Sequence, residues 1–143
     1  MPRTVTIEVE GPPVAKARAR VTRRGVTYTP AKTVEYEGQV ALAARLAMGG
    51  HAPLNGPLST MVEVHLPVPR SWSKKKQAAA LAGDLLPTTR PDLDNVVKAA
   101  LDGCAGVVFL DDAQVVECAS LKSYSPTPKL IITVAPMGGC PRE

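Results

Sequence analysis

One segment of the sequence carries most of its structural and chemical information, and it reads Arg90-Pro91-Asp92-Leu93-Asp94-Asn95-Val96-Val97-Lys98. Two shorter pieces follow it, Leu101-Asp102-Gly103 and Leu110-Asp111-Asp112-Ala113-Gln114-Val115-Val116. The proline favours an extended residue before it, and the apolar residues after it recur with helical spacing. The sequence therefore predicts a helix from about Leu93 to Cys104, a turn at Asp111-Asp112, and a strand from Ala113 to Tyr124.

Two pairs of aspartates flank this helix, Asp92 with Asp94 and Asp111 with Asp112. The first pair lies at the expected start of the helix and the second at the start of the strand, where short loops can bring them together. Like charges at ~4 Å repel by roughly 4 kcal/mol at an effective dielectric of 20, so such a site needs a cation. Oxygen ligands favour Mg²⁺ or Mn²⁺ over zinc. A Mg²⁺ held by carboxylates beside a lysine such as Lys98 is a common arrangement in enzymes that hydrolyse phosphodiesters.

Each acidic pair also has a purely structural interpretation. Aspartate is a favoured helix N-cap, which can account for Asp92 or Asp94, and an ordinary turn can account for Asp111-Asp112. Capping does not explain two aspartates on either side of a single leucine with a lysine one turn later. Both interpretations stay open at this point.

Taken together, these motifs resemble the RusA family of Holliday junction resolvases. The similarity rests on Pro91-Asp92-Leu93-Asp94-Asn95 with Lys98, on Leu101-Asp102-Gly103, and on Asp111-Asp112-Ala113-Gln114-Val115-Val116 with a later Lys122. It extends to Gly11-Pro12-Pro13 and to Arg24-Gly25-Val26-Thr27-Tyr28-Thr29-Pro30 ahead of a helix, and it covers roughly Thr4 to Val134. The two acidic motifs at this separation form a specific signal, whereas either pair alone is a weak one.

The resemblance implies an α+β domain that works as a homodimer and makes symmetrical, Mg²⁺-dependent nicks in four-way DNA junctions. Carried over by position, it implies that Asp92, Asp94 and Asp112 bind the metal and that Lys98 is the essential lysine. The mechanism expected from this is in-line attack on the phosphodiester by a metal-activated water, with Lys98 stabilising charge or positioning the water. Asp102 and Asp111 would orient the metal ligands or Lys98.

A basic segment lies between Gly11 and Val34, where six basic residues and no acidic one occur. Its alternation and the turn at Arg23-Arg24-Gly25 predict a hairpin or an extended arm. We expect phosphate contacts from it, although a solvated strand face also explains the pattern. A second basic cluster begins a helix expected at Lys74–Leu81, and it either contacts DNA or only solubilises the helix end. The expected DNA-binding residues are Lys16, Arg18, Arg20, Arg23, Arg24, Lys74 and Lys75.

The remaining patterns predict an α+β fold, a two-layer sandwich in which helices pack on a mixed β-sheet. Alternating or apolar runs predict strands at residues 3–10, 58–67 and 130–134, with the second of these in the centre. A helix is expected from Pro30 to about Met48, with an apolar face that includes Val34, Val40, Ala44 and Leu46. Residues 1–135 are expected to form a single domain and residues 136–143 a flexible tail.

Composition limits the class of protein. The 143 residues carry a formal net charge of +4, which suits a polyanionic partner without proving one. Cys104, Cys118 and Cys140 are too scattered for a zinc site and fit a reducing compartment, and the first two are expected in the core. No apolar run approaches 18 residues, so a cytoplasmic location is expected.

Three functions are compatible with these observations. The motif set favours a metal-dependent junction endonuclease of the RusA type, acting in DNA recombination and repair. The alternatives are a related nuclease for other branched nucleic acids and a DNA-binding module without catalysis. Mg²⁺-dependent nicking separates the last from the other two, and substrate competition separates the two nucleases.

Overall fold

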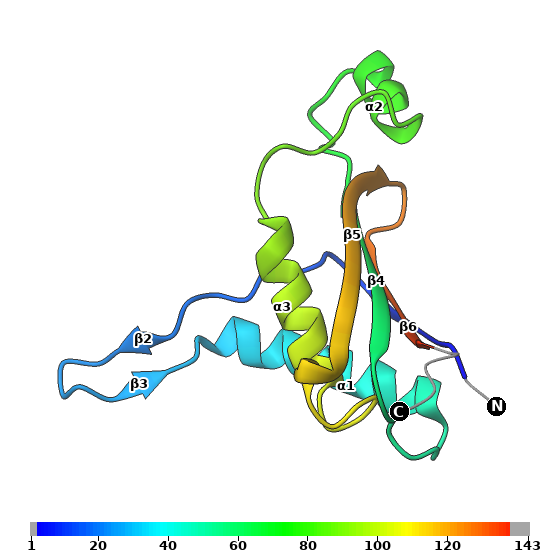
Figure 1. The fold of residues 1–143 in the computed structure, drawn as a ribbon. Helices are drawn as coiled ribbons and strands as arrows, with labels where there is room; N and C mark the ends of the chain where they lie inside the picture. The colour runs from blue at the N-terminus through cyan, green and yellow to red at the C-terminus, as the bar shows by residue number, and fades with distance from the viewer. Residues whose placement is uncertain (1–2, 138–143) are drawn as a thin grey trace.

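A four-stranded mixed sheet forms one of two layers in the computed structural model, which describes residues 3–137 (Figure 1). Its strands are β1 (Val5–Glu10), β4 (Leu58–Pro67), β5 (Val115–Ser125) and β6 (Lys129–Pro136), in the order β1-β6-β4-β5. β4 is parallel to β5, and the other neighbouring strands are antiparallel. The prediction that residues 58–67 form a central strand is confirmed, and β5 lies at an edge of the sheet.

Helices α1 (Ala31–Met48) and α3 (Leu93–Cys104) form the second layer. Every second residue of β1, β4 and β6 is buried, as in Val5, Ile7 and Val9, because these side chains face the two helices. The other face of the sheet is more open to solvent. The predicted α+β fold, with helices packed on a mixed sheet, is confirmed, and the helix predicted at 93–104 has the bounds expected for it.

The two helices approach each other closely at Gly103. A Cβ atom on Gly103 would lie 2.6 Å from Val40 Cβ on α1, so this position has no room for a larger residue. The face of α1 that is buried contains Thr33, Tyr36, Val40, Ala44 and Met48. The prediction that Val34 and Leu46 belong to this face is wrong, since they are 55% and 76% exposed.

A two-stranded hairpin extends from the body of the molecule (Figure 1). Its strands β2 (Arg20–Val21) and β3 (Thr27–Tyr28) are antiparallel, and Gly25 supplies the positive φ of the turn. The predicted hairpin is confirmed, but residues 15–19 are not a strand. We call residues 18–28 the arm.

The remaining elements lie close to the positions predicted from the sequence. Helix α2 (Lys74–Leu81) is capped by the Ser73 side chain, and Asp112–Gln114 form a short 3-10 helix, η1, ahead of β5. Within residues 3–137, none of the helices has the length and apolarity needed to span a membrane.

The cysteine prediction holds only in part. Cys104 is buried, whereas Cys118 is exposed on the edge strand, so its expected place in the core is wrong. Cys140 and residues 138–143 of the predicted tail lie outside the described residues, and β6 continues to Pro136.

Candidate active site

The first turns of α3 carry the first acidic pair and Lys98. Asp92 occupies the N-cap position, but within the described residues its side chain accepts no capping hydrogen bond. Asp94 lies in the first turn, where its carboxylate accepts a hydrogen bond from the Asn95 N–H at 2.9 Å and where the helix dipole favours negative charge. Capping therefore does not explain Asp92, whose carboxylate is available to a ligand.

A polar pocket of about 470 Å³ lies between the start of α3 and the basic segment. Its lining includes Lys16, Arg18, Arg90, Asp92 and Asn95. One turn further along α3, Lys98 lines a smaller hollow of about 180 Å³ together with Lys16 and Arg18. The structure thus brings one predicted metal ligand, the predicted essential lysine and two predicted phosphate contacts to one side of α3.

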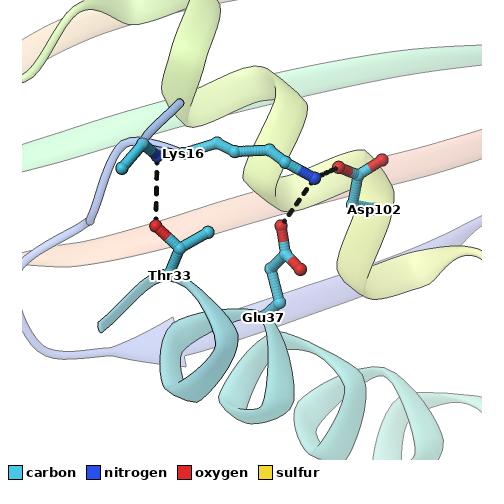
Figure 2. A network of polar contacts seen from close by, with 5 residues as sticks. Lys16, Thr33, Glu37 and Asp102 are labelled. Carbon is cyan, nitrogen blue, oxygen red and sulfur yellow. Dashed lines mark hydrogen bonds and ion pairs between the residues drawn. The ribbon is translucent and has the colours of Figure 1, made fainter. Parts of the chain in front are cut away.

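Lys16 reaches between α1 and α3 (Figure 2). Its ammonium pairs with the carboxylate of Asp102 on α3 and with that of Glu37 on α1, the second at 3.2 Å. The hydrogen bond to Asp102, with a smaller contribution from Glu37, raises the pKa of Lys16 despite partial desolvation. Two carboxylates therefore balance this ammonium from within the protein, and they would compete with the phosphate that the sequence led us to expect at Lys16.

The backbone beside Lys16 is also anchored. The Lys16 N–H donates to the Asn95 carbonyl at 2.9 Å, and the Ala17 N–H donates to Thr33 Oγ1 at 3.1 Å. These bonds join the basic segment to both helices just before the arm begins. The arm therefore starts from a fixed position beside Asp92.

Lys122, on β5, holds the loop that leads into Asp92. Its ammonium donates to the carbonyl oxygens of Thr89 at 2.9 Å and Pro91 at 3.1 Å. It is in register with buried Val64, so it lies on the face of the sheet that the helices cover. Lys122 thereby positions the start of α3 from the neighbouring strand.

The second acidic pair lies at the opposite end of α3. The Asp111 carboxylate caps η1 by accepting a hydrogen bond from the Ala113 N–H at 3.0 Å. The Gln114 side chain completes this capping box and donates to the Leu54 carbonyl at 3.0 Å. The turn interpretation is confirmed for Asp111, while the Asp112 side chain takes no part in this cap.

Asp112 lies in an excess of negative charge. The Ala113 N–H lowers the pKa of Asp111, whereas a hydrogen bond shared with Asp111 raises the pKa of Asp112. The negative charges of Asp111 and Asp102 add to this rise. A cation near Asp112 would relieve the repulsion.

The two acidic pairs do not meet within one chain. Among residues 3–137, no three His, Cys, Asp or Glu side chains are placed to hold a metal ion together. α3 has 12 residues and is therefore about 18 Å long, with one pair near each end. The expectation that short loops join the pairs is wrong for the single chain. Asp112 instead lies near the last turn of α3, where the charge of Asp102 raises its pKa.

Of the other predicted DNA contacts, Arg20 lines a hollow together with Arg90 and Pro91, just before α3. The rest lie on the turn of the arm and on α2. Arg20 begins β2, and Arg23 and Arg24 are exposed at the turn of the arm. Lys74 and Lys75 are exposed on the first turn of α2, which lies outside the two layers (Figure 1). Their contact with DNA stays a prediction.

Several residues that shape the site were given no role from the sequence. Arg90 and Asn95 line the polar pocket, and their closeness to Asp92 in sequence was an available signal. The positioning role of Lys122 was also signalled, because a charge at an inward position of a strand needs specific partners. Glu37 gave no such signal, since its pairing with Lys16 depends on how α1 packs.

Comparison with known proteins agrees with these observations. The protein-family model described as Endodeoxyribonuclease RusA matches residues 10–135. The chain is also 38% identical over 138 residues to a protein of Bacillus subtilis (strain 168) named uncharacterized protein YqaN, which covers 91% of this chain and 94% of the relative. The family match includes the basic segment, α3, η1 and β5.

Proposed function

The chain belongs to the RusA family of endodeoxyribonucleases, and from this premise we propose that it resolves four-way DNA junctions by paired, symmetrical nicks that depend on Mg²⁺. Hydrolysis of DNA is the activity of the family. We propose in addition that its substrate is the four-way junction, that its metal is Mg²⁺, and that it acts in recombination and repair.

The polar pocket is the observation that carries this proposal. Arg18 and Arg90 line it beside the free carboxylate of Asp92, so cationic and anionic groups face the same space. Guanidinium groups suit the oxygens of a phosphodiester. A carboxylate beside a bound phosphate would repel it unless a cation lay between the two.

The donor chemistry suits Mg²⁺, although residues 3–137 of one chain do not bring three such ligands together. Mg²⁺ keeps several waters and is usually held by one or two carboxylates plus phosphate oxygens of the substrate. Asp92 and Asp94 supply carboxylates of this kind at the start of α3. When bound, the ion supplies Lewis acidity and a more acidic water.

The chain's own residues then have distinct tasks. Arg18 and Arg90 orient the phosphodiester in the polar pocket. Lys98, one helical turn from Asp94, stabilises the negative charge that grows on the phosphate as the P–O bond breaks. Lys122 keeps the Asp92 loop in place through its two carbonyl contacts.

A homodimer is part of the proposal. Resolution needs nicks in two opposed strands, and a two-fold dimer offers two copies of one site. Because Asp112 and Asp92 lie near opposite ends of α3 in one chain, we assign Asp112 to the site built around Asp92 and Asp94 of the other chain.

Incubation with a synthetic four-way junction and Mg²⁺, with mapping of the cuts, tests the function. Asp92→Asn, Asp94→Asn and Asp112→Asn should each abolish cleavage and leave junction binding intact or tighter, because each removes a negative charge without altering shape. Asp84→Asn, in the exposed loop after α2, is the matched control and should cut normally. Wild-type nicking by any of the three variants removes that residue from the site.

Lys98→Ala tests the role of the ammonium. Its loss should lower the turnover rate by about 10²- to 10³-fold with a much smaller effect on affinity, since the charge acts mainly in the transition state. Single-turnover cleavage and a binding titration separate the two effects. A variant that binds poorly but cuts at the normal rate would make Lys98 a binding residue instead.

A further inference from the structure

A second pocket, apolar in character, shares a wall with the polar pocket. It has a volume of about 290 Å³, and its lining includes Pro13, Leu66, Pro87, Arg90, Pro91 and Tyr124. Arg90 lines both pockets. The segment that leads into Asp92 therefore has a polar hollow and an apolar hollow beside it.

Tyr124 is held in place from the α2 side of the molecule. Its ring meets that of Trp72 edge-on, with centroids 5.3 Å apart and planes at 70°. The Lys76 ammonium lies 4.1 Å from the centre of the Trp72 ring, and the Gln77 side chain donates to the Trp72 carbonyl at 2.7 Å. Through these contacts α2 supports the Tyr124 ring, and the proposed nuclease function does not account for that support.

A nucleotide has the same two-part chemistry, an anionic phosphate next to a flat, largely apolar base. The polar pocket offers guanidinium groups to the phosphate, and the apolar pocket offers proline rings and an aromatic ring to the base. Proline rings lose little conformational freedom when a ligand binds. A pocket of this size is at the small end of ligand sites, so it suits one ring system rather than a peptide segment.

We propose that the apolar pocket receives one unstacked nucleobase of the DNA substrate, next to the phosphate held in the polar pocket, with Tyr124 as the residue that contacts it. The inference rests on the proposed function, because it takes DNA as the substrate. Unstacking a base costs least where the duplex is already interrupted, as at a branch point. Thr89 and Arg90 also line the pocket.

An abasic scan of a synthetic four-way junction tests this. Each junction lacks one base near the branch point, and its affinity is measured without Mg²⁺. At one position the missing base should weaken wild-type binding about fivefold or more, the range expected for a base stacked on an aromatic ring. In Tyr124→Leu the same lesion should cost less than about twofold, because the ring that the base would contact is gone.

Two variants serve as controls. Tyr124→Phe keeps the ring and should retain the wild-type penalty. Leu121→Ala lies on the opposite face of β5, in register with Glu63, and should behave as the wild type. If Tyr124→Leu fails to fold, Trp72→Leu replaces it, because it leaves β5 unchanged, loosens Tyr124 and should also reduce the penalty.

The base pocket is overturned if one missing base weakens binding equally in the wild type and in Tyr124→Leu, or if no missing base weakens binding. If the loss of affinity depends on Tyr124 but the wild type never cuts a junction when Mg²⁺ is added, the nuclease proposal fails and the base pocket stands. If the protein cuts junctions but the loss of affinity does not depend on Tyr124, the base pocket fails and the nuclease proposal stands.

Discussion

Lys16 and Arg18 lie two residues apart on the basic segment, but their charges have different surroundings. The Lys16 ammonium is paired with Asp102 and Glu37, whereas the Arg18 side chain is exposed at the edge of the polar pocket. A phosphate that approached Lys16 would compete with two carboxylates. The two residues should therefore contribute differently to stability and to DNA binding.

Replacing Lys16 by Met should lower the free energy of unfolding by about 0.2–1 kcal/mol, the range for a partly exposed ion pair. The folded-state pKa of Lys16 is raised above its ordinary value of 10.5. The contribution is thus fully present below that pH and is lost as the pH rises through the raised pKa. Urea unfolding at pH 8 and at strongly alkaline pH checks this, with exposed Lys32→Met as the control. An equal loss at both pH values would mean that packing, not charge, is responsible.

For DNA binding, Arg18 should matter more than Lys16. Arg18→Ala should reduce the salt dependence of junction binding by about one unit of slope for each phosphate that the variant no longer neutralises. Lys16→Met should leave the slope nearly unchanged, because its charge is already balanced within the protein. Titrations at several salt concentrations measure both slopes. If Arg18→Ala also leaves the slope unchanged, the basic segment is only a solvated surface.

Asp112→Asn should raise the melting temperature while it abolishes cleavage. In the absence of divalent metal, the variant removes the repulsion between Asp112 and its neighbours Asp111 and Asp102, and the new amide can donate to Asp111. Thermal unfolding in EDTA measures the change, and Asp84→Asn should leave the melting temperature as it is. A lower melting temperature for Asp112→Asn would show that its carboxylate stabilises the fold.

At the scale of elements, hydrophobic periodicity and the positions of turn residues predicted most of the fold. α3 and β4 have the predicted bounds because each combines a clear period with a turn residue at its ends. The buried face of α1 could not be predicted in the same way. Thr33 and Tyr36 are buried and Val34 is exposed, because α3 and the anchored segment around Ala17 select the face.

In the candidate site, too, local features could be predicted from the sequence and features that depend on tertiary packing could not. The sequence predicted that Asp92, Asp94 and Lys98 share the start of one helix, since local spacing determines this. It could not predict the distance between Asp92 and Asp112, which depends on how the loop after α3 folds. It also gave no indication that Glu37 would approach Lys16.

Gly103→Ala should test the contact between α1 and α3. The added methyl group would lie 2.6 Å from Val40 Cβ, so one helix must move, at a cost of about 1–3 kcal/mol in the free energy of unfolding. Gly38→Ala, on α1, is the matched control, because nothing lies within 4 Å of its added Cβ. The control should stabilise the protein by about 0.5–1 kcal/mol. Equal effects in urea unfolding would show that the helices pack less tightly at Gly103.

At the scale of the whole molecule, the separation of the acidic pairs makes the homodimer testable. Asp92→Asn and Asp112→Asn should each be inactive alone, but a mixture that exchanges chains should regain nicking. A mixed dimer contains one site in which Asp92 and Asp94 come from one chain and Asp112 from the other, all intact. Sedimentation should give about twice the chain mass of 15.1 kDa.

The mixed protein should nick one strand and not resolve the junction, since its second site carries both substitutions. Asp92→Asn mixed with Asp94→Asn is the control, because no combination of those chains rebuilds a complete site. No recovery in the test mixture would place all three carboxylates in a single chain. Equal recovery in the control mixture would show that the recovered nicking does not come from a site rebuilt from two chains. A strict monomer would remove the paired nicks from the proposal.

The position of β6 also has a consequence for how the protein is made. β6 lies between β1 and β4, with Val5 paired to Val134 and Thr60 to the same residue from the other side. β1 leaves the ribosome first, yet it has no partner strand until the chain has been translated as far as Pro136. During that interval the edges of β1 and β4 that β6 will occupy are unpaired, and unpaired strand edges are prone to aggregation. Slow expression at low temperature, with chaperones in excess, should therefore yield more soluble protein than rapid induction.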